Sequence, residues 1–410
     1  MDELFYNSVE TINQRSEFHM PLRRSTQAFD QYLPFMAAVI QCEAASWKRE
    51  WDEVEFVTAC HVHGVAALIA YGSERCRLPA HIPMIVQEQL TQSLNTAKVF
   101  ERLHKKQLDV MFTGFQGQSI PFIVLKGTAM AYEYYPKPYL RTRGDTDLII
   151  PEESRKVVND LMLGLGFEIS MESNAQLNSY QRCYVKEDDL RFKHTIDVHW
   201  RISNSQLFGP SFSWQEIFCS TAPIRGSGHN FEFMTLLPIN QLFHACTHRA
   251  VHLHSKYSVS ETDYSGDRLI WLHDIALISA KLTEREWRDL AALCHQKMTC
   301  TVVRNAVLAS QLYYCFECPK WFLKEMQGFE GESSASLVYG SANWISVQLA
   351  EFRAITNSRD RVHLLWEKLF PSPTSTLTQY GKKTRLWLLV LYPWRWVKIV
   401  VDQFHLSRNR

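Results

Sequence analysis

Hydrophobic residues recur at helical spacing through the first quarter of the chain. Residues 35–42, 54–70 and 84–110 repeat apolar side chains every three or four positions, with few Gly or Pro residues between them. Such spacing places the apolar side chains along one face of a helix. We therefore predict a helical region over residues 28–115, in which residues 93–108 belong to one long helix that leads into the first strand.

The pattern becomes strand-like in the next part of the chain. Residues 122–125 and 145–150 are short apolar runs beside Gly or Pro residues, which predicts buried strands. Residues 182–186 and 190–202 alternate polar and apolar side chains on either side of Asp188-Asp189, which predicts a hairpin.

Helical spacing returns after residue 236, in the segments 238–254, 267–280, 283–296 and 301–314 and in a tail after residue 341. Together these elements indicate an α+β fold, in which a small mixed sheet with its own helices is flanked by N-terminal and C-terminal helical regions. We predict three parts: an N-terminal helical region at 1–110, a sheet-containing core at 111–235 and a C-terminal helical domain at 236–410.

Composition narrows the class of partner. The 410 residues include 44 Lys and Arg against 43 Asp and Glu, a net charge of +1, which argues against nonspecific electrostatic binding to nucleic acid. The ten cysteines show no disulfide-like rhythm, and the first ten residues are acidic and lack the apolar core of a signal peptide. We therefore expect a cytoplasmic protein in a reducing compartment.

No stretch of the sequence reaches the length of a transmembrane helix. Residues 386–404 come nearest, but Pro393, Arg395 and Lys398 interrupt them. The favoured interpretation is a C-terminal helix that docks on the core of the protein itself. The alternative is peripheral membrane contact through the tryptophans of this segment, with basic residues beside them.

Two carboxylates on the second predicted strand are the first candidates for chemistry. Asp145 and Asp147 are two residues apart, so they project from one face of a strand while Thr146 projects from the other. Their charges repel unless a cation lies between them, and Mg²⁺ prefers oxygen ligands. Asp197, on a later strand with His199 on the same face, would complete a set of three carboxylates. The alternative is a solvated turn ahead of a core strand.

Lys126-Gly127-Thr128 follows the first predicted strand and begins a helix. Gly lets the backbone approach a phosphate closely, and a helix N-terminus offers free N–H groups. Arg141 and Arg143 stand just ahead of the acidic pair and would either neutralise phosphates or pair with Asp145 to hold it. An ordinary turn is the alternative, because the spacing of a Walker loop is absent.

Three histidines, His244, His248 and His252, recur every four residues on one predicted helix. Histidines at this spacing chelate Zn²⁺ in some proteins, but no HExxH arrangement is present, and packing inside a helical bundle is favoured. Asp267 and Asp274, in the following segment, are expected to pair with these histidines.

Taken in order, these motifs resemble a bacterial nucleotidyltransferase family of the polymerase-beta-like superfamily. The matching pieces are strand-LKG, R-x-x-G-D-x-D from Arg141, a helix that ends in LGF, and D-V-H-W-R; the later LFHACTHRAVH is similar to that family's helical C-terminal half. The resemblance covers roughly residues 59–391. The resemblance assigns no role to Arg141.

The resemblance implies transfer of a nucleoside monophosphate from an NTP, such as ATP, to an acceptor, on a nucleotidyltransferase-type sheet. Asp145 and Asp147 match the metal-binding pair, and Asp197 matches the third carboxylate, which often activates the acceptor. Gly127 and Thr128 match the pair that cradles the triphosphate, with Lys126 and the two arginines beside it. Two Mg²⁺ ions are the expected cofactor, with Mn²⁺ as a substitute.

The resemblance leaves the acceptor open among a sugar, a peptide or protein, and a small molecule. The C-terminal helices are expected to shape its pocket, lined by His199, His244, His248 and Arg249. Two rival hypotheses are a non-catalytic member of the fold that binds nucleotide or protein, and a metal-dependent hydrolase built on the histidine face.

Overall fold

A computed structural model describes residues 26–76, 82–171, 180–209, 212–225, 232–253, 257–259, 262–264, 266–327, 332, 334, 344–371, 373, 376–377, 380–381 and 384–408. The first 25 residues of the predicted N-terminal region, and residue 254 of the predicted segment 238–254, lie outside this described part.

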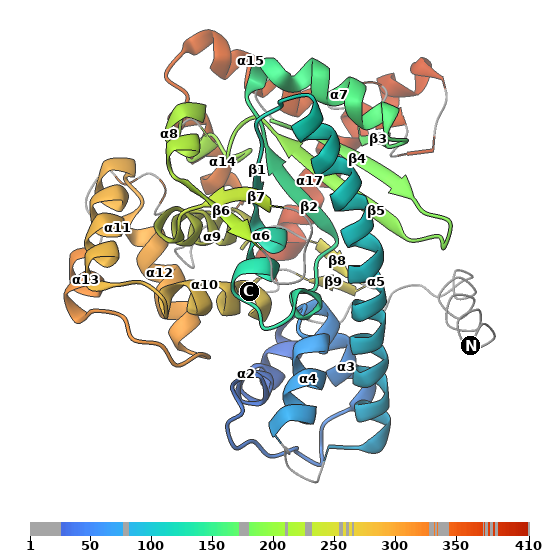
Figure 1. Ribbon diagram of the computed structural model, residues 1–410. Coiled ribbons are helices and arrows are strands. Elements are labelled where there is room, and N and C mark those ends of the chain that lie inside the picture. The colour runs from blue at the N-terminus through green and yellow to red at the C-terminus, as the bar shows by residue number, and fades with distance from the viewer. Residues whose placement is uncertain are drawn as a thin grey trace.

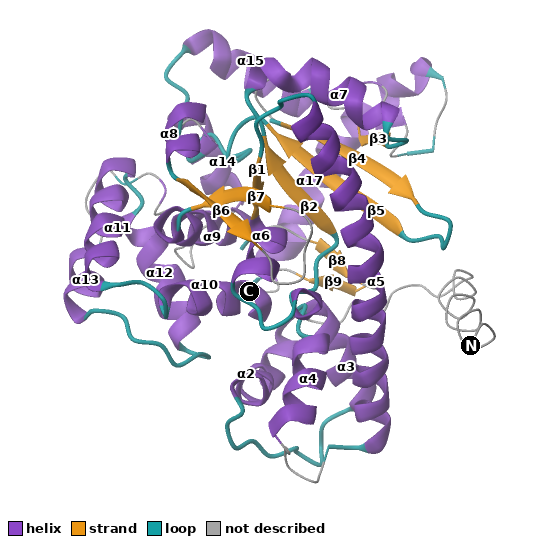
Figure 2. Cartoon of the chain, viewed as in Figure 1, coloured by secondary structure: helices purple, strands orange, loops and turns teal. Residues whose placement is uncertain are grey.

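A seven-stranded mixed sheet forms the centre of the protein, in the order β3-β4-β5-β2-β1-β7-β6 (Figure 2). The strands are β1 (Ile123–Leu125), β2 (Asp145–Ile149), β3 (Glu168–Met171), β4 (Gln181–Glu187), β5 (Lys193–His199), β6 (Thr221–Arg225) and β7 (Glu232–Leu236). Two pairs are parallel, β2 with β5 and β1 with β7, and the other neighbours are antiparallel. The sheet and its flanking helices confirm the predicted α+β class and the hairpin of β4 and β5.

Helices precede the sheet as predicted, with one difference. After the 3-10 helix η1 (Thr26–Tyr32), the helices are α2 (Leu33–Gln41), α3 (Glu53–Val62), α4 (Ala66–Cys76) and α5 (Met84–Gly117). The apolar repeat over 54–70 is divided between α3 and α4, because Gly64 has a φ of +72° and ends the first helix. Side chains are tolerated poorly at such a φ, whereas Gly adopts it freely.

Within and after the sheet, further helices follow. They are α6 (Lys126–Glu133), α7 (Arg155–Gly164), α8 (Trp214–Cys219), α9 (Pro238–His252), α10 (Leu269–Ser279), α11 (Glu284–Lys297), α12 (Cys300–Gln311), α13 (Lys320–Glu325), α14 (Trp344–Ala354), α15 (Ser358–Leu369) and α17 (Leu388–Arg408), with 3-10 helices η2 (Pro138–Leu140), η3 (Glu152–Ser154) and η6 (Arg385–Trp387). A small hairpin joins β8 (Tyr257–Val259) and β9 (Thr262–Tyr264).

The long helix α5 connects two hydrophobic cores (Figure 1). Its first half, including Leu90, packs in a core that the N-terminal helices share with α9, α10, α11 and α12. Its second half, including Phe112, packs in a separate core against the sheet. The predicted boundary at 110/111 falls inside this helix. The division into three domains stays a prediction.

The two faces of the sheet pack against different partners. Leu148 and Val198 lie in the core that contains the second half of α5. Ile149 lies on the other face, with Ile202 and Leu236. Because strand side chains alternate, this face of β2 is also the one that carries Asp145 and Asp147.

Among the described residues, no single helix has both the length and the apolarity to cross a membrane. α3 and α4 meet these criteria only as a pair, which is bent by 111°, and their side chains fill the N-terminal core. The cysteine spacing gave no sign of a disulfide, but Cys42 is disulfide-bonded.

Candidate active site

The junction of β1 and α6 forms one wall of the site. β1 ends at Leu125 and α6 begins at Lys126, as the sequence predicted. Lys126 has a φ of +50°, a left-handed conformation that is uncommon for a residue with a side chain and often marks a functional position. At Gly127 the backbone is crowded, since a Cβ there would lie 3.4 Å from both Arg141 Nη1 and Arg143 Cβ.

The carboxylates meet where β2 and β5 run side by side. Asp147 pairs in register with Asp197 on these parallel strands. Ligand atoms of Asp147, Asp197 and His199 all lie within 4.8 Å of one another. Asp145 is exposed at the start of β2 and is not a member of this close group. The structure thus brings together Asp147 and Asp197, which are fifty residues apart in the chain, and adds His199 to them.

Asp147 is the most strongly held of these carboxylates. Its Oδ1 accepts a hydrogen bond from Lys126 Nζ at 2.7 Å and lies 2.9 Å from His199 Nε2. Burial would raise the pKa of Asp147, but the Lys126 ammonium and the contact with His199 lower it well below its ordinary value. The pKa of Lys126 is raised in turn, because the nearby carboxylates outweigh its burial. Asp147 is therefore ionised and Lys126 is charged at neutral pH.

The other two carboxylates are less well compensated. The pKa of Asp145 is raised to about 7, mainly by burial of the carboxyl and next by the charge of Asp147. The residue is nevertheless exposed to solvent in part. The same two causes raise the pKa of Asp197. Gln181 Nε2 donates to Asp197 Oδ2 at 2.9 Å, whereas Asp197 Oδ1 is buried with no hydrogen-bond partner among the described residues.

These donors fit a divalent cation. His199 Nδ1 is, like Asp197 Oδ1, buried with no hydrogen-bond partner in the described part of the chain. Buried polar atoms normally have partners, so two such atoms side by side point to a group that binds between them. Carboxylate oxygens suit Mg²⁺ or Mn²⁺, and one imidazole is compatible with Mn²⁺.

Thr128 lies on the opposite side of β2 from the carboxylates. Its side chain is fully buried, and its hydroxyl lies 2.9 Å from that of Thr146. The Thr146 hydroxyl also lies 2.8 Å from His104 Nε2. The hydroxyl of Thr128 is therefore occupied within the protein, and its contact with a triphosphate stays a prediction.

The polar contacts continue away from Thr146. His104 Nδ1 lies 3.2 Å from His194 Nδ1, and His194 Nε2 lies 3.0 Å from Asp188 Oδ2. Burial, followed by the nearby Arg143 charge, lowers the pKa of His104 well below its ordinary value, so its ring is neutral. We call the five residues Thr128, Thr146, His104, His194 and Asp188 the buried polar chain.

Both predicted phosphate-binding arginines make buried ion pairs instead. Arg141 donates from Nε and Nη2 to the Asp274 carboxylate at 2.7–3.0 Å. Tyr135 also donates to Asp274, at 2.7 Å. Arg143 lies 2.8 Å from Glu101 and its side chain is only 3% exposed. The Arg141 guanidinium and the Cβ of Arg143 lie close to Gly127, but both guanidinium groups are held by the protein's own carboxylates.

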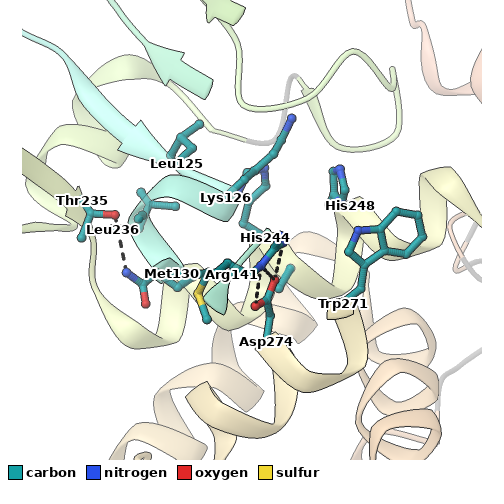
Figure 3. A pocket seen from close by; sticks show the side chains of 13 residues that line it. Leu125, Lys126, Met130, Arg141, Thr235, Leu236, His244, His248, Trp271 and Asp274 are labelled. Atoms are coloured by element: carbon teal, nitrogen blue, oxygen red, sulfur yellow. Dashed lines mark hydrogen bonds and ion pairs between the residues drawn. The ribbon is translucent and has the colours of Figure 1, made fainter. Parts of the chain in front are cut away.

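The histidine face of α9 lies beside the junction. His244 and His248 line a cavity with Lys126, Trp271 and Asp274, and Figure 3 shows these side chains around a common space. Burial, and then the Lys126 charge, lowers the pKa of His244 to about 3. His244 and His248 thus line a cavity, and its role as an acceptor pocket stays a prediction.

The remaining residues of this helix have other roles. His252 lies against Trp271 with a ring separation of 6.0 Å. Arg249 is buried and pairs with Asp267, so it does not line the cavity. The expectation that Asp267 and Asp274 pair with histidines was wrong, because both bind arginines. Among the described residues the histidine face also forms no close group of metal ligands.

Sequence reasoning missed several residues of the site. Gln181, which hydrogen-bonds to Asp197, is the first residue of β4 and pairs with His199. The predicted hairpin began one residue later, so extending it would have found Gln181. Trp271 and the two carboxylates that hold Arg141 and Arg143 carry no local signal, because their contacts are formed by distant parts of the chain.

The site combines three features: a strand with two acidic residues, a third carboxylate in register on the parallel neighbouring strand, and an adjoining strand–helix junction. This combination suits the chemistry of phosphorus-containing groups. The chain belongs to the uncharacterised nucleotidyltransferase family, whose family model matches residues 48–314. This span includes every site residue described above. A search of curated proteins finds no match to the chain.

Proposed function

We propose that the protein is a Mg²⁺-dependent nucleotidyltransferase of the polymerase-beta-like superfamily, which moves a nucleoside monophosphate from an NTP to an acceptor. The observation that carries this proposal is the in-register pairing of Asp147 and Asp197 on parallel strands, with Asp145 two residues earlier on the same face. Family membership supports the reaction class. The metal, the donor and the acceptor are inferences from the geometry.

Asp145, Asp147 and Asp197, with His199 beside them, would hold the metal ions. Two divalent ions in such a site neutralise the triphosphate and stabilise the attacking and leaving oxygens of an in-line displacement. Lys126 already lies 2.7 Å from Asp147, so its ammonium is placed to contact a phosphate oxygen next to the metal site. The N–H groups at the start of α6, near Gly127, would contribute further donors.

In the reaction, an acceptor oxygen forms a bond to the α-phosphorus while the bond from that phosphorus to the pyrophosphate oxygen breaks. Asp197, which matches the family's third carboxylate, would take the acceptor's proton as a general base. His199, on the same strand as Asp197, holds Asp147 of β2 in position.

The acceptor would enter the cavity between β1 and α9. The two histidines that line it, His244 and His248, are neutral, since burial lowers the pKa of both. Neutral imidazoles and the Trp271 ring offer hydrogen bonds and an apolar surface, while the two cations that also line the cavity, Lys126 and Arg141, are each paired with a carboxylate. These features favour an uncharged hydroxyl-bearing acceptor, such as a sugar or a peptide side chain, over nucleic acid.

Calorimetric titration of the four NTPs, with and without Mg²⁺, tests the proposal. Wild-type protein is expected to bind one NTP only with Mg²⁺, and Asp145→Ala/Asp147→Ala is expected to lose this binding. Glu153→Ala/Asp289→Ala, which removes two exposed acidic residues elsewhere, is the matched control and keeps it.

Radiolabelled nucleotide then separates transfer from binding. The label of an α-³²P NTP should appear in an acceptor fraction, whereas a γ-³²P label should leave as pyrophosphate. Metal-dependent binding without any transfer across candidate acceptors would favour the non-catalytic alternative, and absence of NTP binding by wild type would contradict the proposal.

A further inference from the structure

The C-terminal helix α17 divides its residues between two faces. Its inner face packs on the end of α15: Phe370 lies between Tyr392 and Trp396, at ring separations of 5.5 and 5.4 Å. Trp396 Nε1 also donates to the Leu369 carbonyl at 3.0 Å. The segment thus packs on the end of α15 with one side of the helix, and docking on the core of the protein stays a prediction.

The outer face of the same helix is apolar and exposed. Leu389, Val390, Trp394 and Val397 are 76%, 59%, 57% and 53% exposed. Their spacing of one, four and three residues puts them on one side of the helix. Leu386 and Trp387, just ahead of α17, are 74% and 45% exposed. We call these six residues the outer stripe.

A second exposed apolar group lies on α15. Val362 and Trp366 are 68% and 61% exposed, and the Trp366 ring contacts Phe370 at 4.4 Å. Single exposed apolar residues are normal on proteins, but a row of them on two adjoining helices marks an interaction surface.

The charges around the outer stripe identify its partner. Residues 380–398 contain five basic residues and no Asp or Glu, whereas the whole chain has 44 basic and 43 acidic residues. Of these five, Arg385 and Lys398 are described and exposed. Over its whole length α17 has three Lys or Arg residues and one Asp. A helix with an apolar outer face, exposed tryptophan and an excess of positive charge has the composition of one that lies in the plane of a membrane interface.

We propose that the outer stripe docks the protein on the surface of an anionic lipid bilayer. The apolar side chains would enter the boundary between headgroups and acyl chains, while Arg385 and Lys398 contact the lipid phosphates. Two tryptophans, Trp387 and Trp394, suit this depth because their rings are apolar with one polar N–H. This proposal does not depend on the proposed enzymatic function.

Sedimentation of the full-length protein with vesicles tests the proposal. We expect binding to vesicles of phosphatidylcholine with phosphatidylglycerol, weaker binding at high salt, and at least tenfold weaker binding to phosphatidylcholine alone. Leu389→Ser/Trp394→Ser should lower the partition coefficient at least tenfold. Val54→Ser/Leu312→Ser, which changes two residues that are 65% and 77% exposed elsewhere, should leave it unchanged.

Circular dichroism melting checks that both double variants fold, and light scattering measures the oligomeric state. Failure of the wild type to bind anionic vesicles at low salt would overturn the proposal. So would equal binding by Leu389→Ser/Trp394→Ser. A wild-type dimer that this variant converts to a monomer, without vesicle binding, would assign the outer stripe to a second copy of the chain instead.

Discussion

The two faces of β2 carry polar side chains one residue apart, and they differ in whether the buried polar atoms have hydrogen-bond partners within the protein. On one face Thr146 belongs to the buried polar chain, in which each link to the next residue is a hydrogen bond. On the other face Asp147 lies next to Asp197, and both Asp197 Oδ1 and His199 Nδ1 are buried without a hydrogen-bond partner among the described residues.

This contrast distinguishes structure from function. A buried polar group that has its partners within the protein contributes to folding, and its loss costs stability. A buried polar group without a partner costs stability in the free protein and is best explained by a ligand that binds there. The first face therefore holds the sheet to α5, while the second is the one that we propose binds metal and nucleotide. The predictions below test that division.

The largest loss of stability is expected where a buried charge loses the opposite charge that it pairs with. Asp274→Ala leaves the Arg141 guanidinium buried and unpaired, and Arg141 is bound by Asp274 through three donor–acceptor contacts. We expect the free energy of unfolding to fall by about 3–5 kcal/mol, as measured by urea denaturation. Asp289→Ala, which breaks an exposed pair with Arg285, should cost under about 1 kcal/mol. Equal losses in the two variants would contradict the structural role of the buried pair.

On the open face, Lys126→Met should weaken nucleotide binding rather than the fold. The substitution removes the ammonium that lies 2.7 Å from Asp147 and, in our proposal, next to the triphosphate. Loss of a hydrogen bond to a charged group costs about 1.5–3 kcal/mol, so the Kd for Mg²⁺–NTP should rise roughly 10- to 100-fold. Lys126→Arg keeps the charge and should recover most of the affinity. Calorimetry with an unchanged Kd for Lys126→Met would remove this residue from the nucleotide site.

The hydroxyl of Thr146, in the buried polar chain, tests the role of the other face of β2. Thr146→Val keeps the shape of the side chain but removes the hydrogen bonds to His104 and Thr128. The free energy of unfolding should fall by about 1–3 kcal/mol, while metal-dependent NTP binding is retained. A variant of normal stability that has lost NTP binding would reverse the assignment of the two faces.

The neutral ring of His104 predicts a dependence of stability on pH. Its pKa is lowered below the unfolded value of 6.5, so the unfolded state binds more protons below that pH and stability falls as the pH falls. His104→Gln keeps hydrogen-bonding capacity but does not titrate. Between pH 6.5 and 4.5, the unfolding free energy of His104→Gln should fall less steeply with falling pH than that of the wild type, by up to about 1.4 kcal/mol per pH unit. Urea denaturation at several pH values measures it, and parallel slopes would count against a neutral, buried His104.

The sequence predicted the parts of this site that depend on local pattern. Alternation along β2 placed Asp145 and Asp147 on one face and Thr146 on the other, because the period of a strand is two residues. The strand–turn–helix at Lys126-Gly127 and the hairpin of β4 and β5 also follow from runs of apolar residues between turns. The idea that Asp197 joins the pair came from the motif and its resemblance, and the register of the strands places it there.

Other features depend on contacts that no local pattern contains. Arg141 and Asp274 are 133 positions apart, so the arginine's partner could not be inferred from its neighbours. The strands β6 and β7 were missed: Pro223 weakens the strand pattern of β6, and a proline is tolerated there because β6 lies at the edge of the sheet. Whether the three carboxylates, the arginines and the histidines act on a nucleotide stays a prediction.

The central claim is that one face of β2 binds a divalent cation and the other does not. Mn²⁺ binding, followed by electron paramagnetic resonance of the free ion, tests this directly in the wild type, Asp147→Asn and Thr146→Val. We predict that the wild type and Thr146→Val bind Mn²⁺ alike, and that Asp147→Asn binds it more than about 100-fold more weakly, a larger loss than a second-shell partner causes. Equal binding by all three proteins, or a loss confined to Thr146→Val, would contradict the account.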